Sequence, residues 1–232
     1  MLSGANVVFL LDVDNTLFDN DRFAADLRAQ LEHWFGAAEC ARYWAIYAEL
    51  RRALDYADYL GTLQRFRAGL ENHPALLQMS PYLLDYPFAQ RLYPRALDAI
   101  AHLRTLGPTV ILSDGDDVFQ PRKIQRAGLW DALRGEVLID VHKQHSLAAM
   151  QQRYPAGHYV MVDDKPQLLA EMKQSLGERL TTVFVRQGHY AAVPLAGIAP
   201  PPDLDIARIG ELCERALADF LPAPYTGNPS TS

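Results

Sequence analysis

Lysine and cysteine are scarce in this 232-residue sequence. A lysine with a chemical role must be one of four: Lys123, Lys143, Lys165 or Lys173. The two cysteines, Cys40 and Cys213, lie far apart in the sequence, so they form neither a metal-binding spacing nor a disulfide framework. They are typical of packing residues in a protein from a reducing compartment.

Long hydrophobic runs and an excess of positive charge are also absent. The net charge is -6, which argues against a nucleic-acid partner or an anionic membrane surface. The apolar run from Val7 to Leu11 is too short to span a membrane or to form the core of a signal peptide, and no basic segment precedes it. We therefore expect a cytoplasmic protein that binds no nucleic acid and no membrane.

Short apolar runs recur along the chain, with helical patterns between them. Residues 7–11 show no alternation, which is typical of a strand buried on both faces of a parallel sheet. Similar runs cover residues 109–112, 136–139, 159–162 and 181–185. Glycines such as Gly107 and Gly177 end the helical patterns. This alternation predicts an α/β fold with a doubly wound, Rossmann-like parallel sheet of about five strands.

One long segment, residues 18–89, contains no strand pattern. Its apolar residues recur at helical spacing and predict three helices, over 23–34, 44–54 and 60–66. We predict an all-helical cap domain over 18–89, inserted into an α/β core formed by residues 1–17 and 90–222. Within the core, the sequence predicts a proline-rich loop over 192–203 and a last helix over 204–220. Residues 223–232 are predicted to form a disordered tail.

The first predicted strand ends in two carboxylates one residue apart, Asp12 and Asp14. In an open α/β sheet, ligands bind beyond the carboxyl ends of the strands. Two carboxylates this close repel each other unless a cation lies between them or one is protonated. A hard divalent cation such as Mg²⁺ removes this repulsion, because it prefers oxygen ligands and usually binds together with a phosphate. A turn or a helix N-cap is the alternative explanation for the same residues.

Polar residues also follow three other predicted strands. Ser113 and Asp114 follow residues 109–112, Lys143 follows 136–139, and the pair Asp163-Asp164 follows 159–162. Each of these has an ordinary explanation when taken alone, as a helix cap, a surface lysine or a solvated turn. Their occurrence at four strand ends in this order favours one shared site.

The four motifs together resemble those of the haloacid dehalogenase-like (HAD) hydrolase superfamily, over nearly the whole chain. The first, D-x-D-x-T, is present as "VVFLLDVDNTL", the second as "TVILSDG" and the fourth as "YVMVDDKPQLL". The third is a lysine, which we assign to Lys143. Lys123 is the other candidate, but it lies inside a predicted helix, and we expect it to contribute little.

Two further features bear on this resemblance. The commoner fourth motif is Gly-Asp with another acid about four residues later, a position that Leu168 occupies here, so Asp163 and Asp164 must serve together. The helical insertion after the first motif resembles the C1 cap of the superfamily. Arginines in this insertion can hold a second anionic group of the substrate, although solvated arginines on helix faces are the simpler interpretation. These arginines are Arg51, Arg52, Arg65 and Arg67.

The resemblance implies a Mg²⁺-dependent hydrolase of small phosphate monoesters. It makes Asp12 the nucleophile that becomes an aspartyl-phosphate, and Asp14 the general acid and then the general base. It implies that Mg²⁺ binds Asp12, the backbone carbonyl of Asp14, and Asp164, with Asp163 at or near the ion. The implied phosphate-binding residues are Thr16, Ser113, Asp114 and Lys143, of which Ser113 and Lys143 also act in catalysis.

The physical chemistry of phosphate esters agrees with these roles. An anionic nucleophile cannot approach an anionic ester without cations, which Mg²⁺ and Lys143 would supply. The two aspartates of the first motif then need opposite protonation states: Asp12 beside the metal stays ionised, while Asp14 can hold a proton.

Other functions remain open at this point. In the 2-haloacid dehalogenases of the superfamily the second acid of the first motif is replaced, so the presence of Asp14 argues for phosphoryl chemistry. A phosphomutase shares the core and differs in the cap. A receiver-like or other non-catalytic phosphate-binding protein also groups acids, a lysine and a hydroxyl, but a receiver chain is much shorter and has no helical cap. We expect a small phosphorylated metabolite as the partner, and a monomer or homodimer.

Overall fold

The computed structural model describes residues 6–54, 56–140 and 147–222. In this part of the chain, six parallel strands form one sheet in the order β3-β2-β1-β4-β5-β6. The strands are β1 (Val7–Leu11), β2 (Thr109–Asp114), β3 (Val137–Asp140), β4 (His158–Asp163), β5 (Leu180–Val185) and β6 (Leu204–Ile206). The predicted α/β fold with a doubly wound parallel sheet is therefore confirmed, with a sixth strand added at one edge.

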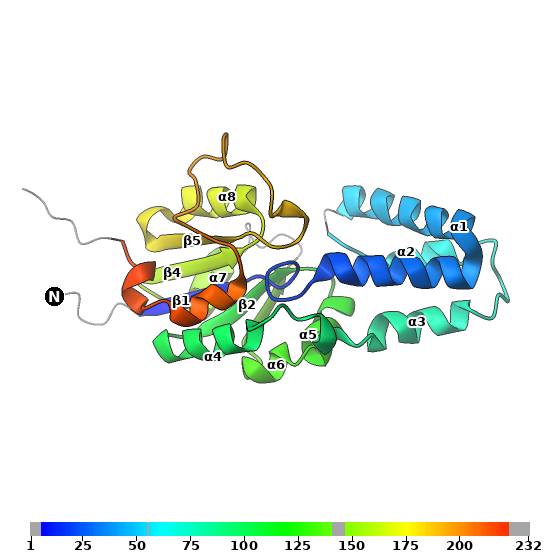
Figure 1. Cartoon of the computed structure of the whole chain (residues 1–232), viewed down its shortest axis with the longest axis horizontal. Coiled ribbons are helices and arrows are strands. Elements are labelled where there is room, and N and C mark those ends of the chain that lie inside the picture. The colour runs from blue at the N-terminus through cyan, green and yellow to red at the C-terminus, as the bar shows by residue number, and fades with distance from the viewer. Residues whose placement is uncertain (1–5, 55, 141–146, 223–232) are drawn as a thin grey trace, which may run out of the picture.

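Helices cover both faces of the sheet (Figure 1). One face carries α4 (Ala96–Leu106), α5 (Phe119–Arg126) and α6 (Leu129–Ala132), and the other carries α7 (Leu147–Arg153) and α8 (Pro166–Leu176). Successive β1 side chains point to opposite faces, so Phe9 joins the core under α4 and Leu10 the core under α8. Burial on both faces explains why β1 is an unbroken apolar run.

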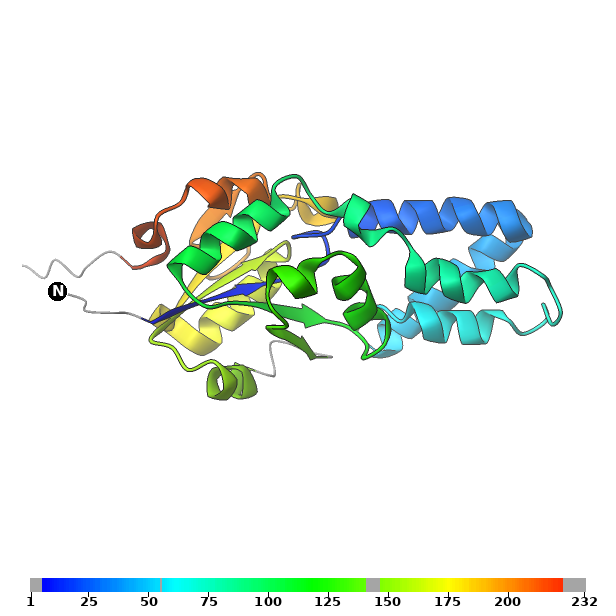
Figure 2. The same ribbon diagram turned by 90° about the horizontal axis from the view of Figure 1, so that it is seen from below.

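The predicted helical insertion lies beyond the carboxyl ends of the central strands. It contains α1 (Asn20–Leu54), α2 (Tyr59–Phe66) and α3 (Leu76–Asp85), and Figures 1 and 2 show these helices side by side. A short 3-10 helix, η1 (Phe88–Arg91), leads the chain back to the core. Within α1, Gly36 has φ 82° and ψ 167°, a conformation open almost only to glycine. The chain reverses there, so the two halves of α1 run antiparallel (Figure 1).

The predicted helix over 204–220 is wrong. The segment contains β6 and two 3-10 helices, η5 (Ile209–Glu214) and η6 (Leu217–Phe220). β6 pairs in parallel with the edge of β5. Asp203 anchors this pairing, since its carboxylate accepts hydrogen bonds from the backbone N–H of Thr182 at 2.8 Å and from Lys173 at 3.0 Å. The hydrogen bonds offered by the open edge of β5 therefore outweigh the helical pattern of the sequence.

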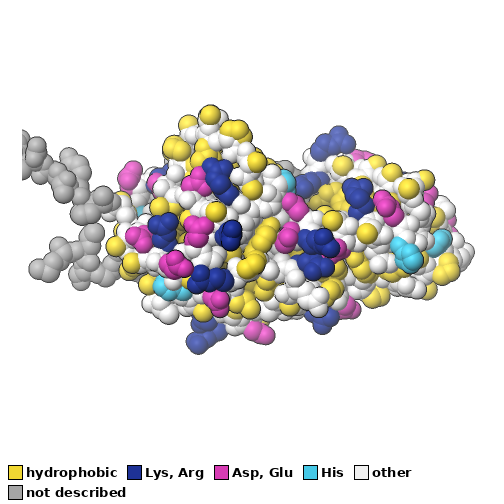
Figure 3. Space-filling model, in the orientation of Figure 1, with side chains coloured by type: hydrophobic (Ala, Val, Ile, Leu, Met, Phe, Trp, Pro, Cys, Tyr) yellow, Lys and Arg dark blue, Asp and Glu magenta, His cyan; other side chains and the backbone are white. Residues whose placement is uncertain are grey.

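The remaining expectations concern the tail, Lys143, the cysteines, a membrane span and the surface charge. The predicted tail, 223–232, lies outside the described residues, as does Lys143. Cys40 is buried, Cys213 is half-buried, and both are free thiols. None of the described helices has the length and apolar character that crossing a membrane requires. Over the coloured part of the face in Figure 3, basic and acidic side chains are interspersed.

Candidate active site

Three buried carboxylates meet at the carboxyl ends of β1 and β4. Asp12 follows β1, Asp163 ends β4 and Asp164 follows it. The backbone N–H of Asp12 donates to the carbonyl of Val162 at 3.0 Å, which places the two strand ends side by side. One carboxylate oxygen from each acid lies within 4.8 Å of the others, and all three residues are at most 2% exposed. Buried anions this close repel strongly, and their oxygen donors fit a hard divalent cation.

The other acid of the first motif, Asp14, is held by different partners. Its carboxylate accepts hydrogen bonds from Lys123 Nζ at 2.5 Å and from Gln120 Nε2 at 3.1 Å. A tight loop follows β1, in which the backbone N–H groups of Leu17 and Phe18 both donate to the carbonyl of Val13. Asp12 and Asp14 therefore have different neighbours in the structure, although they are only two positions apart in the sequence.

Asn15 shapes this loop. It has φ 59°, in the left-handed region that asparagine tolerates better than most residues. Its side-chain oxygen accepts hydrogen bonds from the backbone N–H groups of Asn20 and Asp21, at 3.1 and 3.2 Å, at the start of α1. Asn15 therefore orients the loop that carries Asp14 and also caps the first helix of the insertion.

Lys123, which the sequence led us to expect to contribute little, contacts the carboxylate of Asp14. Its side chain is 2% exposed, and its Nζ lies 5.4 Å from the ring centre of Phe18 and 5.6 Å from that of Phe119. A buried ammonium group needs a partner of opposite charge, and here the partner is Asp14. The helical spacing of Phe119, Gln120 and Lys123 signals this placement, because it puts all three on the buried face of α5.

The predicted hydroxyl groups lie at the same edge of the sheet. Ser113 is buried, and its hydroxyl accepts a hydrogen bond from Gln120 Nε2 at 2.8 Å. Gln120, which the sequence analysis did not identify, therefore links Ser113 to Asp14. The Thr16 hydroxyl is also buried and has no hydrogen-bond partner within the described parts of the chain. It can therefore accept or donate a hydrogen bond when a ligand binds.

Asp114 and Lys143 are the two remaining residues that the sequence predicts for the site, and only Asp114 lies within the described residues. The Asp114 carboxylate pairs with Lys165 Nζ at 3.4 Å, which brings a further lysine to the site. Lys165 directly follows the Asp163-Asp164 pair in sequence, and this adjacency is the signal that could have identified it. Lys143 falls in the segment 141–146, outside the described residues, so its assignment stays a prediction.

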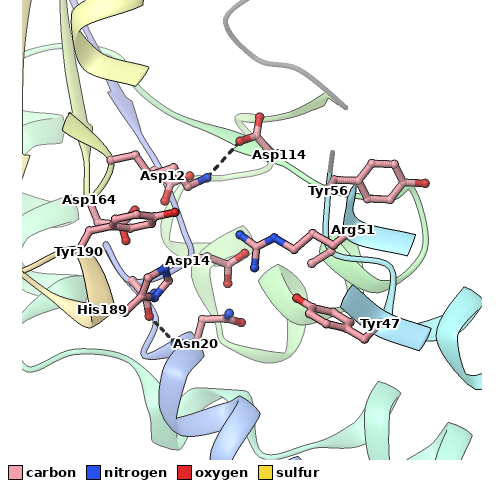
Figure 4. A pocket seen from close by; sticks show the side chains of 13 residues that line it. Asp12, Asp14, Asn20, Tyr47, Arg51, Tyr56, Asp114, Asp164, His189 and Tyr190 are labelled. Atoms are coloured by element: carbon pink, nitrogen blue, oxygen red, sulfur yellow. Dashed lines mark hydrogen bonds and ion pairs between the residues drawn. The ribbon is translucent and has the colours of Figure 1, made fainter. Parts of the chain in front are cut away.

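A cavity opens between these strand ends and the helical insertion (Figure 4). The sheet side contributes the acids Asp12, Asp14, Asp114 and Asp164. The insertion contributes Tyr47, Arg51 and Tyr56, and the short helix η4 (Gly188–Tyr190) contributes His189 and Tyr190. His189 and Tyr190 follow β5 in the sequence. Polar residues after this fifth strand are the sequence feature that could have identified them. The cavity thus joins a buried acidic cluster to a wall that carries an arginine and three tyrosines.

Comparison with known proteins agrees with this arrangement. Residues 7–185 match the family model of the haloacid dehalogenase-like hydrolases. A crystal structure described as a haloacid dehalogenase-like hydrolase from Burkholderia xenovorans LB400 is 56% identical, with a TM-score of 0.85, and the match covers 92% of this chain and 100% of that one. No curated protein sequence matches this chain.

Two more distant structures share the fold. The HAD hydrolase YfnB from Bacillus subtilis, solved bound to magnesium, is 20% identical with a TM-score of 0.60. L-2-haloacid dehalogenase from Xanthobacter autotrophicus, with chloropropionic acid covalently bound, is 20% identical with a TM-score of 0.58. Each of these matches covers 91% of this chain and 98% of the other. The family match spans the strands β1 to β5 and all four motifs. The chain therefore belongs to the haloacid dehalogenase-like hydrolases.

Proposed function

We propose that this hydrolase acts on small phosphate monoesters, with Mg²⁺ as its cofactor, through an aspartyl-phosphate on Asp12. The observation that carries the proposal is Asp14, which lines the same cavity as Asp12 and Asp164 and is held by Lys123 and Gln120. The ester oxygen of a phosphate monoester needs a proton as it leaves, whereas a halide leaves without one. A carboxylate held at this place therefore favours phosphate esters over 2-haloacids as substrates.

The acidic cluster would hold the cofactor. Asp12, Asp163 and Asp164 are the residues whose oxygens lie close enough together for this, and carboxylate oxygens are the ligands that Mg²⁺ prefers. When bound, Mg²⁺ supplies positive charge that offsets the repulsion between a phosphoryl group and the Asp12 carboxylate. The Thr16 and Ser113 hydroxyls lie at the same strand ends and would hydrogen-bond the phosphoryl oxygens. Lys143 stays the predicted source of further positive charge.

The reaction takes two steps. In the first, a carboxylate oxygen of Asp12 bonds to phosphorus while the bond from phosphorus to the ester oxygen breaks, and Asp14 gives a proton to that oxygen. In the second, the oxygen of a water molecule attacks phosphorus, Asp14 takes the proton of that water, and phosphate leaves Asp12. The ion pair with Lys123 corresponds to the ionised form of Asp14, which is the form that the second step requires.

A substrate panel tests this function. Phosphate release is measured from p-nitrophenyl phosphate and from small phosphorylated metabolites, with Mg²⁺, with a chelator, and after Mg²⁺ is restored. Halide release from 2-chloropropionate is measured in parallel. We expect phosphate release that stops on chelation and returns with Mg²⁺, and no halide release. Release of halide in place of phosphate, or phosphate release that ignores the chelator, would contradict the proposal.

A further inference from the structure

The insertion side of the cavity carries one arginine, Arg51, in the last turn of α1. Figure 4 shows its guanidinium group extending into the cavity toward Asp14, with Tyr47 and Tyr56 beside it. Tyr47 is itself held in place, since its ring stacks on that of Tyr59 with centroids 5.0 Å apart. Arg51 therefore lies beside a packed aromatic side chain, opposite the strand ends that carry the acidic cluster.

The Arg51 guanidinium group has the Tyr47 side chain as a hydrogen-bond partner, but its charge has no counter-charge among the described residues. Arg42 and Arg65 of the insertion form ion pairs, Arg42 with Glu39 and Arg65 with Glu49. Arg52 donates instead to the backbone carbonyl of Ala48. No described carboxylate forms an ion pair with Arg51. The lysines at the strand ends differ in this respect, because Lys123 pairs with Asp14 and Lys165 with Asp114. A guanidinium group that points into a cavity without a carboxylate partner is suited to an anion that arrives with the ligand.

Arg51 also keeps its charge in these surroundings. Burial lowers the pKa of its guanidinium group, but the neighbouring Tyr47 and Tyr190 hydroxyls raise it by more, so the pKa lies above its ordinary value. The group is therefore a permanent cation at the insertion side of the cavity.

We propose that Arg51 binds a second anionic group of the substrate, so that the protein selects phosphate monoesters that also carry a carboxylate or a second phosphoryl group. This inference rests on the proposed phosphatase function. The phosphoryl group that is transferred must lie at Asp12, whereas Arg51 reaches the cavity from the opposite wall. A substrate that spans the cavity would place one anion at each end, and the planar fork of Arg51 can donate two parallel hydrogen bonds to either type of group.

Matched substrates separate charge from size. We would compare 3-phosphonooxypropanoate with 3-phosphonooxypropanamide, which have the same shape and differ in the charge of one end. Propane-1,3-diyl bisphosphate forms a third arm that distinguishes a second phosphoryl group from a carboxylate. The expected kcat/KM of the wild-type protein is about 10- to 100-fold higher for a doubly anionic ester than for the amide, the range that a charge-assisted hydrogen bond provides.

Variants assign this preference to Arg51. Arg51→Met keeps the length of the side chain and should abolish the preference, with little effect on the amide; Arg51→Lys should retain part of it. Arg52→Met is the matched control, because Arg52 lies next in the same helix and donates to the backbone carbonyl of Ala48. Circular dichroism checks that each variant is folded. Equal turnover of the ester and the amide by the wild-type protein, or an equal loss on both in Arg51→Met, would overturn the inference.

A binding experiment keeps this test independent of turnover. Calorimetric titration with 3-phosphonopropanoate and with propylphosphonate, neither of which can be hydrolysed, measures the contribution of the second anion directly. Tighter binding of 3-phosphonopropanoate that disappears in Arg51→Met supports the anion site even if no ester is hydrolysed, in which case the proposed phosphatase function alone has failed. Equal binding of the two compounds contradicts the anion site.

Discussion

At the scale of single residues, Asp12 and Asp14 have different surroundings and should therefore fail in different ways. Asp12 belongs to the buried acidic cluster, whereas Asp14 is bound to Lys123 and Gln120. Asp12→Asn removes the nucleophile, so no phosphoenzyme should form. Asp14→Asn keeps the nucleophile but loses proton transfer, which lowers the rate by about 10²–10⁴-fold. With p-nitrophenyl phosphate, whose leaving group needs little protonation, phosphate should accumulate on Asp12.

Mass spectrometry of the acid-quenched protein measures this difference. Asp98→Asn is a suitable control, because Asp98 is an exposed residue of α4 on the core and does not line the cavity. Phosphate attached to a residue other than Asp12 would contradict the assignment of the nucleophile.

A second residue-scale prediction concerns Lys123. Lys123→Met removes the cation that holds Asp14, and loss of a buried ion-pair partner leaves a carboxylate without its counter-charge. We expect kcat to fall by about 10- to 100-fold, because a displaced catalytic group can cost on the order of 10²-fold. The second step should suffer most, so the phosphoenzyme should accumulate in a rapid-quench experiment. A purely structural role would not change the fraction of enzyme that is phosphorylated.

Lys173→Met is the control for removal of a lysine. Lys173 is largely buried and pairs with Asp203 at the opposite end of the sheet. This variant should keep its activity. If Lys123→Met is as active as the wild-type protein, Lys123 does not position Asp14. Lys143→Ala is still expected to remove most activity without unfolding the protein, since Lys143 is the predicted neutralising charge.

At the scale of elements, the reversal of α1 at Gly36 makes a prediction about stability. An added methyl group would meet no atom within 4 Å, but the backbone angles there, φ 82° and ψ 167°, are open almost only to glycine. Gly36→Ala should therefore lower the free energy of unfolding by about 1–3 kcal/mol through backbone strain alone. Gly157→Ala is the matched control, because that site is equally open and has no positive φ. Urea unfolding followed by circular dichroism measures both; equal effects would contradict the argument.

At the scale of the whole molecule, a small polar network ties the beginning of the insertion to its end. The Asp26 carboxylate in α1 accepts hydrogen bonds from the Tyr86 hydroxyl at 2.5 Å and from Arg91 in η1 at 2.7 Å. The chain leaves the core just before α1 and returns through η1, so this network holds the two connections together (Figure 1).

This network makes stability depend on pH. Burial raises the pKa of Asp26, but the Tyr86 and Arg91 hydrogen bonds lower it by more, so the folded pKa lies below the ordinary value of 3.8. Asp26 therefore contributes stability above about pH 3.8 and loses it as the pH falls through the lower folded pKa. Asp26→Asn should lower the free energy of unfolding at neutral pH by about 1–2 kcal/mol, because hydrogen bonds to a charged group are lost.

Urea unfolding at a series of pH values between neutral and acid checks this prediction. The difference between the wild-type protein and Asp26→Asn should shrink as the pH falls below about 3.8, where Asp26 becomes protonated in the unfolded chain. A difference that stays constant with pH would show that the charge of Asp26 is not responsible.

Local pattern alone determined the central sheet and the place of the acidic cluster. Four strands, β1, β2, β4 and β5, are largely apolar and buried on both faces. Such runs can be recognised in the sequence without any knowledge of distant residues. Parallel strands end at one edge of a sheet, so Asp12 and Asp163 were expected to meet, and the structure brings them together.

Tertiary structure decided the features that depend on a distant partner. β6 forms because it can pair with the open edge of β5. The three residues of β6 are too few to show a strand pattern, so the sequence predicted a helix there. Lys123 is buried because Asp14, 109 positions earlier, supplies its counter-charge. Arg51 reaches the cavity because the chain reverses at Gly36 and brings the second half of α1 back toward the strand ends. In each case the deciding interaction joins segments whose proximity exists only in the folded chain.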